Sequence, residues 1–559
     1  MSKPRNEEVE YEERLRRRLL ILQQSIKDGK VKIHEGLKIN DSLKAVKYGV
    51  DGEIDLNTVD GLVRSMALAV TELHDREELK KACSLAEIQN SYFKILETNF
   101  SHFYDLMKKN KLTPHTAALY VSENAQAVIE VTAKLKEFLD YLKDFWNELG
   151  EIAYIHVEDM HKNIKGIFGG DLFPAHDENL ASKCGIYIDT IILPDPFLRS
   201  LHIFEKSPPD EKAYYFIKHA MNILQYKDLA CTEVGIPIVV VLPDISVLEV
   251  EEKQFYHKLG QADSLKHSEK LFGRSFTSIE ELIEFSETLD TIERAVEQIS
   301  DESRVLFDDT WTGDVKDQLI RASKDTNNKL FGLTNPGRVL LSQSVGRMSI
   351  SNELLIKARK LNGTPIIDAP TSWQYLVWKM EYDANQAEQI YNVKDLHIVR
   401  GLQNLAKGKM RWLGNVPPNA LIEVRKQGAM EEIRNILGTG IDELISDNLS
   451  NFNRSHDQLF ANINNAFEQH KANIKKLKAK KWKFVGSDVG SWLVTGTLAI
   501  TSVATGYPVW GLAAYALDQV LDPPKLKELP NSIKEIITEN NKLQKSPVGM
   551  LYKIAKKNI

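Results

Sequence analysis

Hydrophobic positions in the first 150 residues recur every three or four residues, which is the spacing of amphipathic helices. The clearest stripe passes through Val128, Val131, Leu135, Phe138, Leu142, Phe145 and Leu149. Gly and Pro are scarce in this region, so few positions interrupt the pattern. The pattern predicts a helical domain, a bundle, over residues 1–150.

The pattern changes after about residue 155. Two short and nearly continuous apolar runs, 185–193 (GIYIDTIIL) and 235–242 (GIPIVVVL), are typical of strands buried on both faces. The segment 211–233 between them has helical apolar spacing, so the strands are expected to be parallel. A third short run, 364–367, precedes Asp368. We therefore expect an α/β core over residues 151–400, interrupted by an acidic helical insertion at about 245–330.

Beyond residue 400 the apolar spacing is again helical. It predicts a helix over 420–437 and one long helix over about 441–484. The expected fold class is mixed α/β and predominantly helical. It comprises an N-terminal helical bundle, a small parallel-sheet core, and a C-terminal domain over 401–559 with a long helix and an apolar helical hairpin.

Charge is distributed unevenly along the chain. The net charge is −6 over 559 residues, yet residues 471–559 hold 15 Lys and 6 acids, whereas residues 244–316 hold 18 acids and 8 bases. The basic excess is densest at Lys471, Lys475, Lys476, Lys478, Lys480, Lys481 and Lys483. Such a cluster is either the solvated end of a helix or a segment that binds an anionic surface.

A stretch without charge follows these lysines. Residues 489–517 contain no charged side chain, and Gly506 and Pro508 indicate a turn near the middle. Two helices of about 14 residues fit this pattern, and each is too short to cross a bilayer alone. Trp492 and Trp510 have the amphipathic rings that are favoured at a membrane interface. The hairpin is therefore either buried in a soluble domain, or masked in solution and able to dock on a membrane.

Candidate catalytic residues follow from the predicted strands rather than from a motif. Asp195, Asp244 and Asp368 each stand at the end of a predicted strand, either next to a proline or two residues before one. Ligands of parallel sheets bind at that edge, and three carboxylates there could hold Mg²⁺ for hydrolysis of a phosphate ester. The alternative is that each Asp caps the turn or helix that follows.

Composition narrows the class of protein. Three cysteines, an odd number, make a disulfide framework unexpected and favour a reducing compartment. The charged N-terminal segment does not resemble a secretory signal, so a cytoplasmic location is expected, with possible recruitment to a membrane. The near-neutral total makes general nucleic-acid binding unexpected.

Three segments resemble parts of large uncharacterised bacterial proteins, some of them associated with phage-defence loci. The segments are ALIEVRKQGAMEEIRNIL (420–437), ILPDPF (192–197) and KSPVGMLY (545–552). The resemblance implies a bacterial, cytosolic origin and a role in immunity with a protein partner encoded nearby. It implies no catalytic or binding residue.

Three functions therefore remain open from the sequence. The first is a partner-dependent effector or interaction protein, not an enzyme and without a cofactor, that acts at an anionic membrane surface through its basic and apolar C-terminal region. The second is a Mg²⁺-dependent phosphohydrolase or nuclease using Asp195, Asp244 and Asp368. The third is a soluble scaffold whose hairpin is part of the core.

Overall fold

The fold is predominantly helical, with one small parallel sheet, which confirms the predicted mixed α/β class. The computed structural model describes residues 4–34, 38–50, 52–170, 180–243, 250–307, 312–325, 333–382, 393–408, 410, 416–447, 451–479, 483–484 and 487–488. The predicted hairpin at 489–517 lies outside these residues. Two compact units are present: Met1–Ile88 with Glu151–Asp159, and Gln89–Gly150 with Met160–Ile559. Residues 89–150 of the predicted N-terminal domain thus belong to the second unit.

The first unit contains helices α1 (Pro4–Lys27), α2 (Lys38–Ala45) and α3 (Gly61–Ala82), with the short 3₁₀ helix η1 (Leu56–Thr58). Leu15 and Leu19 of α1 share a core with Val63 of α3. The carboxylate of Asp60 accepts hydrogen bonds from the backbone N–H groups of residues 62 and 63, which caps α3 at its start. Helix α3 therefore begins where its first amide groups find an acceptor.

The helical layer of the second unit begins with most of α4 (Leu85–Lys109), all of α5 (Pro114–Ser122) and residues 125–150 of α6 (Ala125–Glu158). Aromatic rings join α4 to α6: Tyr92 lies 5.3 Å from Trp146, and Phe100 lies 5.4 Å from Phe138. Phe138 belongs to the apolar stripe that predicted this part of α6, whereas no stripe was predicted for α4. All four rings are buried, so the facing sides of α4 and α6 form core.

The sheet contains β1 (Lys165–Phe168), β2 (Thr190–Pro194), β3 (Val239–Leu242) and β4 (Thr364–Ile366) in the order β3-β2-β1-β4, all parallel. Ile167 of β1 pairs with Ile192 of β2 on one side and with Pro365 of β4 on the other. Strands β2, β3 and β4 overlap the three predicted apolar runs. Strand β1 was not predicted, because its four residues KGIF include a charge and a glycine.

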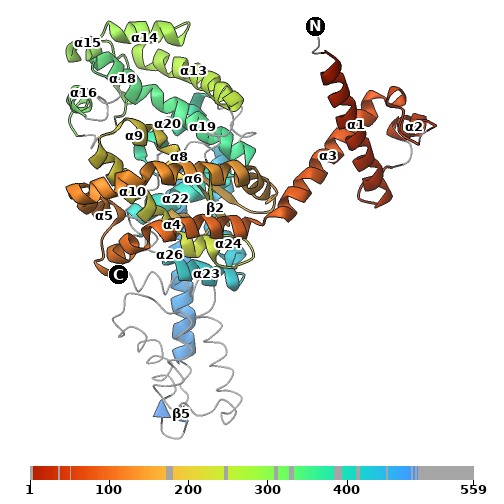
Figure 1. Cartoon of the computed structure of the whole chain (residues 1–559). Coiled ribbons are helices and arrows are strands. Elements are labelled where there is room, and N and C mark those ends of the chain that lie inside the picture. Colours follow the sequence, from red (N-terminus) through yellow and green to blue (C-terminus); the bar gives the residue numbers. More distant parts are fainter. Residues whose placement is uncertain are drawn as a thin grey trace. The chain divides into compact units, whose positions relative to one another are not determined.

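The outer edge of β3 is closed by a side chain rather than by another strand. Gln89 of α4 is fully buried, its amide nitrogen donates to the carbonyl of Val241, and its amide oxygen accepts from the Val241 N–H, both at 2.9 Å. These bonds take the place of a neighbouring strand for one residue. Helices surround the sheet in the second unit (Figure 1).

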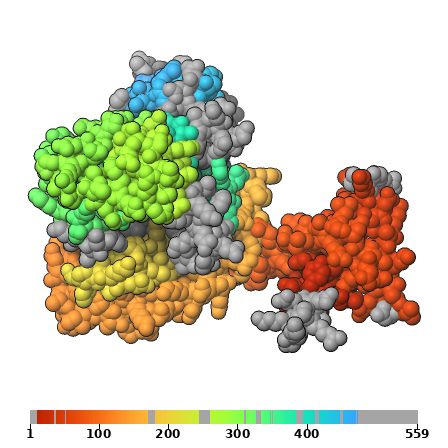
Figure 2. Space-filling view, turned by 90° about the horizontal axis from the view of Figure 1, so that it is seen from above, coloured from red at the N-terminus to blue at the C-terminus, as the bar shows by residue number. Residues whose placement is uncertain are grey.

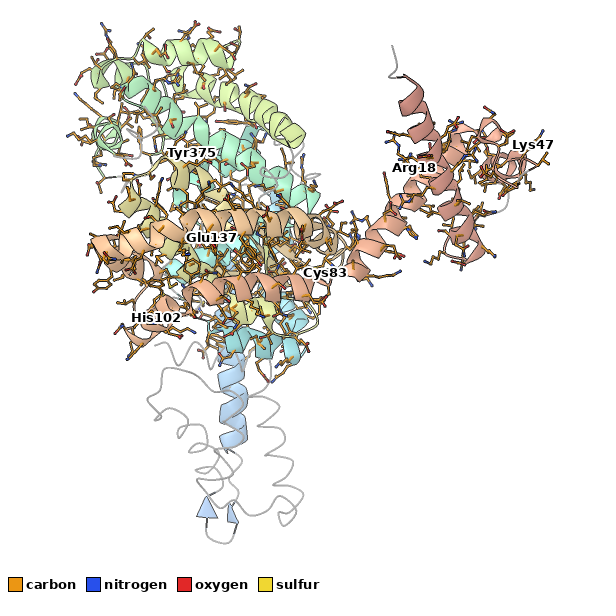
Figure 3. The ribbon with its side chains drawn as sticks, viewed as in Figure 1. Arg18, Lys47, Cys83, His102, Glu137 and Tyr375 are labelled. Atoms are coloured by element: carbon orange, nitrogen blue, oxygen red, sulfur yellow. The ribbon has the colours of Figure 1, made fainter. Side chains whose placement is uncertain are left out.

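Helix α7 (Leu180–Cys184) lies between β1 and β2 in the sequence. Between β2 and β3 the chain forms α8 (Pro196–Arg199), α9 (Leu201–Lys206), α10 (Pro209–Leu224) and α11 (Lys227–Cys231). Helix α19 (Gly346–Lys360) precedes β4, and α20 (Pro370–Tyr382) follows it. Tyr375 of α20, labelled in Figure 3, is fully buried and packs edge-on against Trp378 at 4.8 Å. Helix α20 thus contributes core directly after β4.

The acidic insertion has a core of its own. It contains α13 (Val250–Phe272), α14 (Ile279–Glu287), α15 (Ile292–Glu297), η2 (Glu302–Arg304), α16 (Val315–Lys324) and α18 (Pro336–Ser344), which gather as one lobe in Figure 2. Leu271, Leu282, Phe307, Leu319 and Leu340 belong to one buried cluster. Apart from Asp263, which is buried and pairs with Lys379, its described acids are not buried, because the helices turn their apolar faces to this cluster.

The C-terminal part of the described chain contains α22 (Val393–Lys407), α23 (Pro418–Lys426), α24 (Met430–Gly438), α25 (Ile441–Asp447) and α26 (Phe452–Ala479), followed by the short antiparallel strands β5 (Lys483–Phe484) and β6 (Ser487–Asp488). The single helix predicted over 441–484 is thus two helices and a strand. Leu459 and Ile463 of α26 are buried, so the first half of α26 is core.

Helix α22 approaches α26 closely at Gly401. A Cβ atom at this position would overlap with Cδ1 of Leu459, so the Leu459 side chain would have to move to admit any side chain at 401. We expect Gly401→Val to lower the free energy of unfolding by about 1–3 kcal/mol, because overpacking forces neighbouring groups apart.

Urea unfolding followed by tryptophan fluorescence measures this change. Asn404→Val places the same β-branched side chain at a partly exposed position of α22, and should change the free energy by less than about 0.5 kcal/mol. Equal effects of the two variants would contradict the close approach.

Candidate functional site

The carboxyl edge of the sheet contains a topological switch point between β1 and β4. From β1 the chain adds β2 and then β3 on one side, and it returns to place β4 on the other side of β1. Ligands of open parallel sheets bind outside the carboxyl ends of the strands at such a point. Gly169 and Gly170 follow β1 here, and Asp368 follows β4.

A buried ion pair lies at this edge. The Nζ atom of Lys183, from α7, is 3.0 Å from Oδ1 of Asp368, and both side chains are almost completely buried. Lys407, from the end of α22, approaches the same carboxylate at 3.4 Å and donates to the Asp368 backbone carbonyl at 3.1 Å. Its side chain is partly exposed. The carboxylate is thus held between one buried and one accessible ammonium group.

Arg400 supplies a third cation. Its guanidinium lies over the ring of Trp373, in the first turn of α20, at 4.3 Å from the ring centroid. The Nε atom of Arg400 is shielded from solvent and makes no hydrogen bond to any residue that the structure describes. An unsatisfied buried N–H costs about 1–3 kcal/mol, so such a donor is expected to have a function. The cation–π contact with Trp373 holds the guanidinium in place without using its N–H groups.

Helix α22 presents these groups on one face. Arg400, Gln403 and Lys407 are spaced by three and four residues and therefore lie one above another on the helix. The amide of Gln403 donates to the carbonyl of Ile367 at 3.1 Å, which fastens the middle of this face to the end of β4. Side-chain hydrogen bonds from Gln403 and Lys407 to backbone carbonyls, together with the ion pair of Lys407 and Asp368, therefore position this face.

The pKa values of the site reflect burial and neighbouring charge. Burial lowers the pKa of Arg400 to about 10, and the carboxylate of Asp368 opposes this shift. Burial would raise the pKa of Asp368, but Lys183 and Lys407 outweigh it, and the pKa is lowered. Burial raises the pKa of the Cys184 thiol to about 12, so this neighbour is not a thiolate at neutral pH. At neutral pH the described side chains here are three cations and one carboxylate.

The three predicted carboxylates have different surroundings. Asp195 is fully buried after β2, and it accepts hydrogen bonds from the N–H groups of Phe197 and Leu198 and from Nε1 of Trp146 at 2.7 Å. It caps α8, which is the alternative role considered for it. Asp368 is paired with lysines, and Asp244 lies outside the described residues. Strand β1 separates Asp195 from Asp368.

Burial raises the pKa of Asp195 to about 6, against the opposing effect of its hydrogen bonds. Two strand spacings of about 4.8 Å lie between the ends of β2 and β4. Within the described part of the chain, no group of three or more His, Cys, Asp or Glu side chains could hold a metal ion. Asp195 accepts hydrogen bonds that cap α8, and Asp368 forms ion pairs with Lys183 and Lys407.

One Ser–His pair resembles part of a catalytic dyad. Oγ of Ser200 lies 2.9 Å from Nε2 of His219, and both residues are fully buried. The rings of Phe197 and Phe204 pack against His219, and burial lowers its pKa to about 3. A substrate has no access to a pair enclosed in this way, so the pair contributes to the core.

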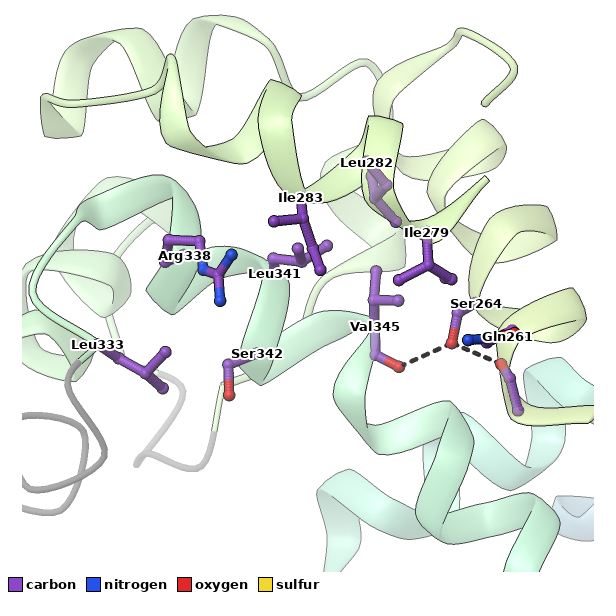
Figure 4. A pocket seen from close by; sticks show the side chains of 11 residues that line it. Gln261, Ser264, Ile279, Leu282, Ile283, Leu333, Arg338, Leu341, Ser342 and Val345 are labelled. Carbon is purple, nitrogen blue, oxygen red and sulfur yellow. Dashed lines mark hydrogen bonds between the residues drawn. The ribbon is translucent and has the colours of Figure 1, made fainter. Parts of the chain in front are cut away.

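A pocket in the insertion offers little chemistry. Its volume is about 300 Å³, and it lies between α13, α14 and α18 (Figure 4). Ile279, Ile283 and Leu341 are among its mostly apolar lining, and Arg338 is its one charged lining residue, which pairs with Glu287. The pocket lacks the converging polar groups of a typical small-molecule site.

The predicted membrane-binding residues are only partly described. Lys471, Lys475, Lys476 and Lys478 lie on the last turns of α26 and Lys483 lies in β5. Lys480, Lys481, Trp492 and Trp510 fall outside the described residues. Among the helices that are described, none is both long and apolar enough to cross a bilayer.

The cations at the switch point were not found from the sequence. Lys183 lies more than 200 residues before Arg400 and Lys407, and only the fold brings it to them. The spacing of Arg400, Gln403 and Lys407 on one helix was a usable signal, but no spacing links them to Asp368.

Comparison with known proteins adds no homologue. No protein-family model matches the chain, and neither a curated protein nor a solved structure is significantly similar to it.

The buried ion pair between Lys183 and Asp368 is expected to contribute to stability in a pH-dependent way. Asp368→Asn should lower the free energy of unfolding by about 3–5 kcal/mol at neutral pH, because it leaves the charge of Lys183 buried without its carboxylate. Since the pKa of Asp368 is lowered in the fold, this stabilisation is present at neutral pH and is lost as the pH falls through that pKa.

Urea unfolding at pH 7 and at acidic pH measures both effects. Asp442→Asn removes the exposed carboxylate that pairs with Lys394, and should cost less than about 1 kcal/mol. A small and pH-independent effect at position 368 would show that the buried pair does not stabilise the edge.

Proposed function

We propose that the α/β core binds a phosphate-bearing small molecule at the switch point between β1 and β4, and that the protein is an interaction protein responsive to this ligand. The observation that carries the proposal is Arg400. Its guanidinium is oriented by Trp373, and its buried Nε has no hydrogen-bond acceptor among the described residues. An anion at this place would supply the acceptor.

The charges favour a phosphate group over a neutral ligand. Arg400 and Lys407 both belong to the face of α22 that meets the end of β4, and the side chain of Lys407 remains partly exposed. Arginine is suited to phosphate because its N–H groups match two phosphate oxygens, while lysine contributes a point charge. The first turn of α20, which begins at Pro370, adds the positive end of a helix dipole.

The groups at this edge favour binding over catalysis. The carboxylate of Asp368 is engaged by two ammonium groups, and the raised pKa of Cys184 keeps its thiol protonated. A general base or nucleophile requires a free lone pair near the ligand. The described groups instead present N–H donors, which hold an anion in place.

Replacement of Arg400 separates a ligand-binding role from a structural one. Arg400→Met should weaken the binding of an anion by about tenfold to a hundredfold, because one charge-assisted contact contributes about 1.5–3 kcal/mol. The free energy of unfolding should stay within about 0.5 kcal/mol or rise, since the variant removes an unsatisfied donor and keeps the apolar stem. Calorimetric titration with inorganic phosphate, pyrophosphate and ATP, together with urea unfolding, measures both.

Lys394→Met is the matched control, because Lys394 is a cation of the same helix that pairs with Asp442. It should bind the anions like the unaltered protein. Absence of binding of all three probes to the unaltered protein would end the proposal. A large loss of stability in Arg400→Met without a change in affinity would make Arg400 structural.

The C-terminal region supports a second candidate function. Helix α26 is buried in its first half and continues without a break into the positions of Lys471, Lys475, Lys476 and Lys478. A helix anchored at one end can present its lysines to an anionic surface. We therefore retain the proposal of a partner-dependent effector, of the kind the resemblance to phage-defence proteins implies, that acts at a membrane.

Charge reversal in this segment tests the membrane proposal. The full-length protein should float with anionic liposomes at low salt. Lys475→Glu combined with Lys476→Glu should remove most of the bound fraction, because each lysine near the surface contributes about 1 kcal/mol. Lys108→Glu combined with Lys109→Glu, two exposed lysines at the end of α4, should have little effect. Failure of the unaltered protein to float would exclude this function.

A further inference from the structure

Helix α22 makes contacts on two neighbouring faces. Arg400 and Lys407 lie on one face, at the switch point. The neighbouring face packs on α26, where Gly401 allows Leu459 to approach and His397 meets Ser455. Helix α22 lies between the anion site and α26. If an anion shifts or immobilises the side chains of its first face, the contacts of its second face with α26 change as well.

Trp373 joins the two faces through side chains. Its ring lies under the guanidinium of Arg400 at 4.3 Å and meets the ring of Phe452 edge-on at 4.9 Å between centroids. Phe452 is the first residue of α26. The same indole therefore contacts the proposed anion-binding group and the start of the C-terminal helix.

The start of α26 is held from both sides. Phe452 stacks on the ring of His397, with 4.1 Å between centroids and 19° between planes. Nδ1 of His397 lies 2.7 Å from Oγ of Ser455, one turn further along α26. All three side chains are buried. The first turn of α26 thus depends on the same aromatic cluster that orients Arg400.

We propose that occupancy of the anion site is transmitted through Trp373 and Phe452 to α26, and so controls the helix that carries the lysine cluster. This inference rests on the proposed anion binding. A bound anion would hold the guanidinium of Arg400 against Trp373. With Trp373 restrained, the first turn of α26 opens less often, and a ligand that reduces local opening couples two sites without a large change in structure.

Hydrogen exchange measures this coupling in the full-length protein. The probe is the tightest binder among inorganic phosphate, pyrophosphate and ATP, at a saturating concentration. Amides of residues 452–467 should exchange at least about threefold more slowly with the probe bound, because exchange in this segment follows its local opening. Amides of α3, in the other unit, should not change.

Phe452→Leu separates coupling from binding. The variant should bind the probe with an affinity within about twofold of the unaltered protein, because the side chain of Phe452 is apolar and donates no hydrogen bond to an anion. It should nevertheless lose the protection of α26. Phe460→Leu, the same substitution at a partly exposed position of α26, should keep both binding and protection.

Each outcome is decisive. Binding of the probe without a change in the exchange of α26 would overturn the inference and leave the proposed function standing. Protection that persists in Phe452→Leu would also overturn it, since the route would not pass through that ring. If none of the three probes binds, the proposed function fails and the inference falls with it.

Discussion

The ion pair between Lys183 and Asp368 joins the short helix that follows β1 to the segment that follows β4, its neighbour in the sheet. Lys183 lies in the short helix α7 that follows β1, and Asp368 follows β4. A buried pair of this kind adds little net stability compared with apolar residues of the same size, because both charges lose their hydration. It instead penalises every arrangement in which one charge is buried alone. The pair therefore sets the position of α7 against β4, and with it the edge on which α22 packs.

Arg400 shows a conflict between stability and function. A fold selected for stability alone would give the buried Nε an acceptor or replace the arginine with an apolar side chain. Here the guanidinium is supported by an aromatic ring, which orients it without occupying its donors. The cost in stability is a reason to attribute the group to ligand binding, because strained or unsatisfied groups persist mainly where a function uses them.

The sequence predicted elements with a long and regular pattern best. The apolar stripe over Val128–Leu149 lies within α6, and the β-branched run ending at Leu242 contains β3. Elements without such a pattern were missed or misplaced. Strand β1 is four residues long and begins with Lys165, a lysine that is buried in the structure. The prediction of one helix over 441–484 was wrong, because the apolar spacing continues from α25 to α26 and does not reveal that they are separate helices. The role of Asp195 as a helix cap followed from its place before Pro196, which is local chemistry.

The sequence by itself determined the predominantly helical class, the parallel strands, the acidic insertion and the lysine-rich C-terminal segment, because each follows from the spacing or charge of neighbouring residues. Only the tertiary structure decided which charges meet. Lys183 lies 185 residues before Asp368 and still further before Arg400, and the order β3-β2-β1-β4 brings the three to one edge. Because these side chains are buried, their charges lose hydration and require a partner. The same side chains on a surface would be hydrated and would not need one another.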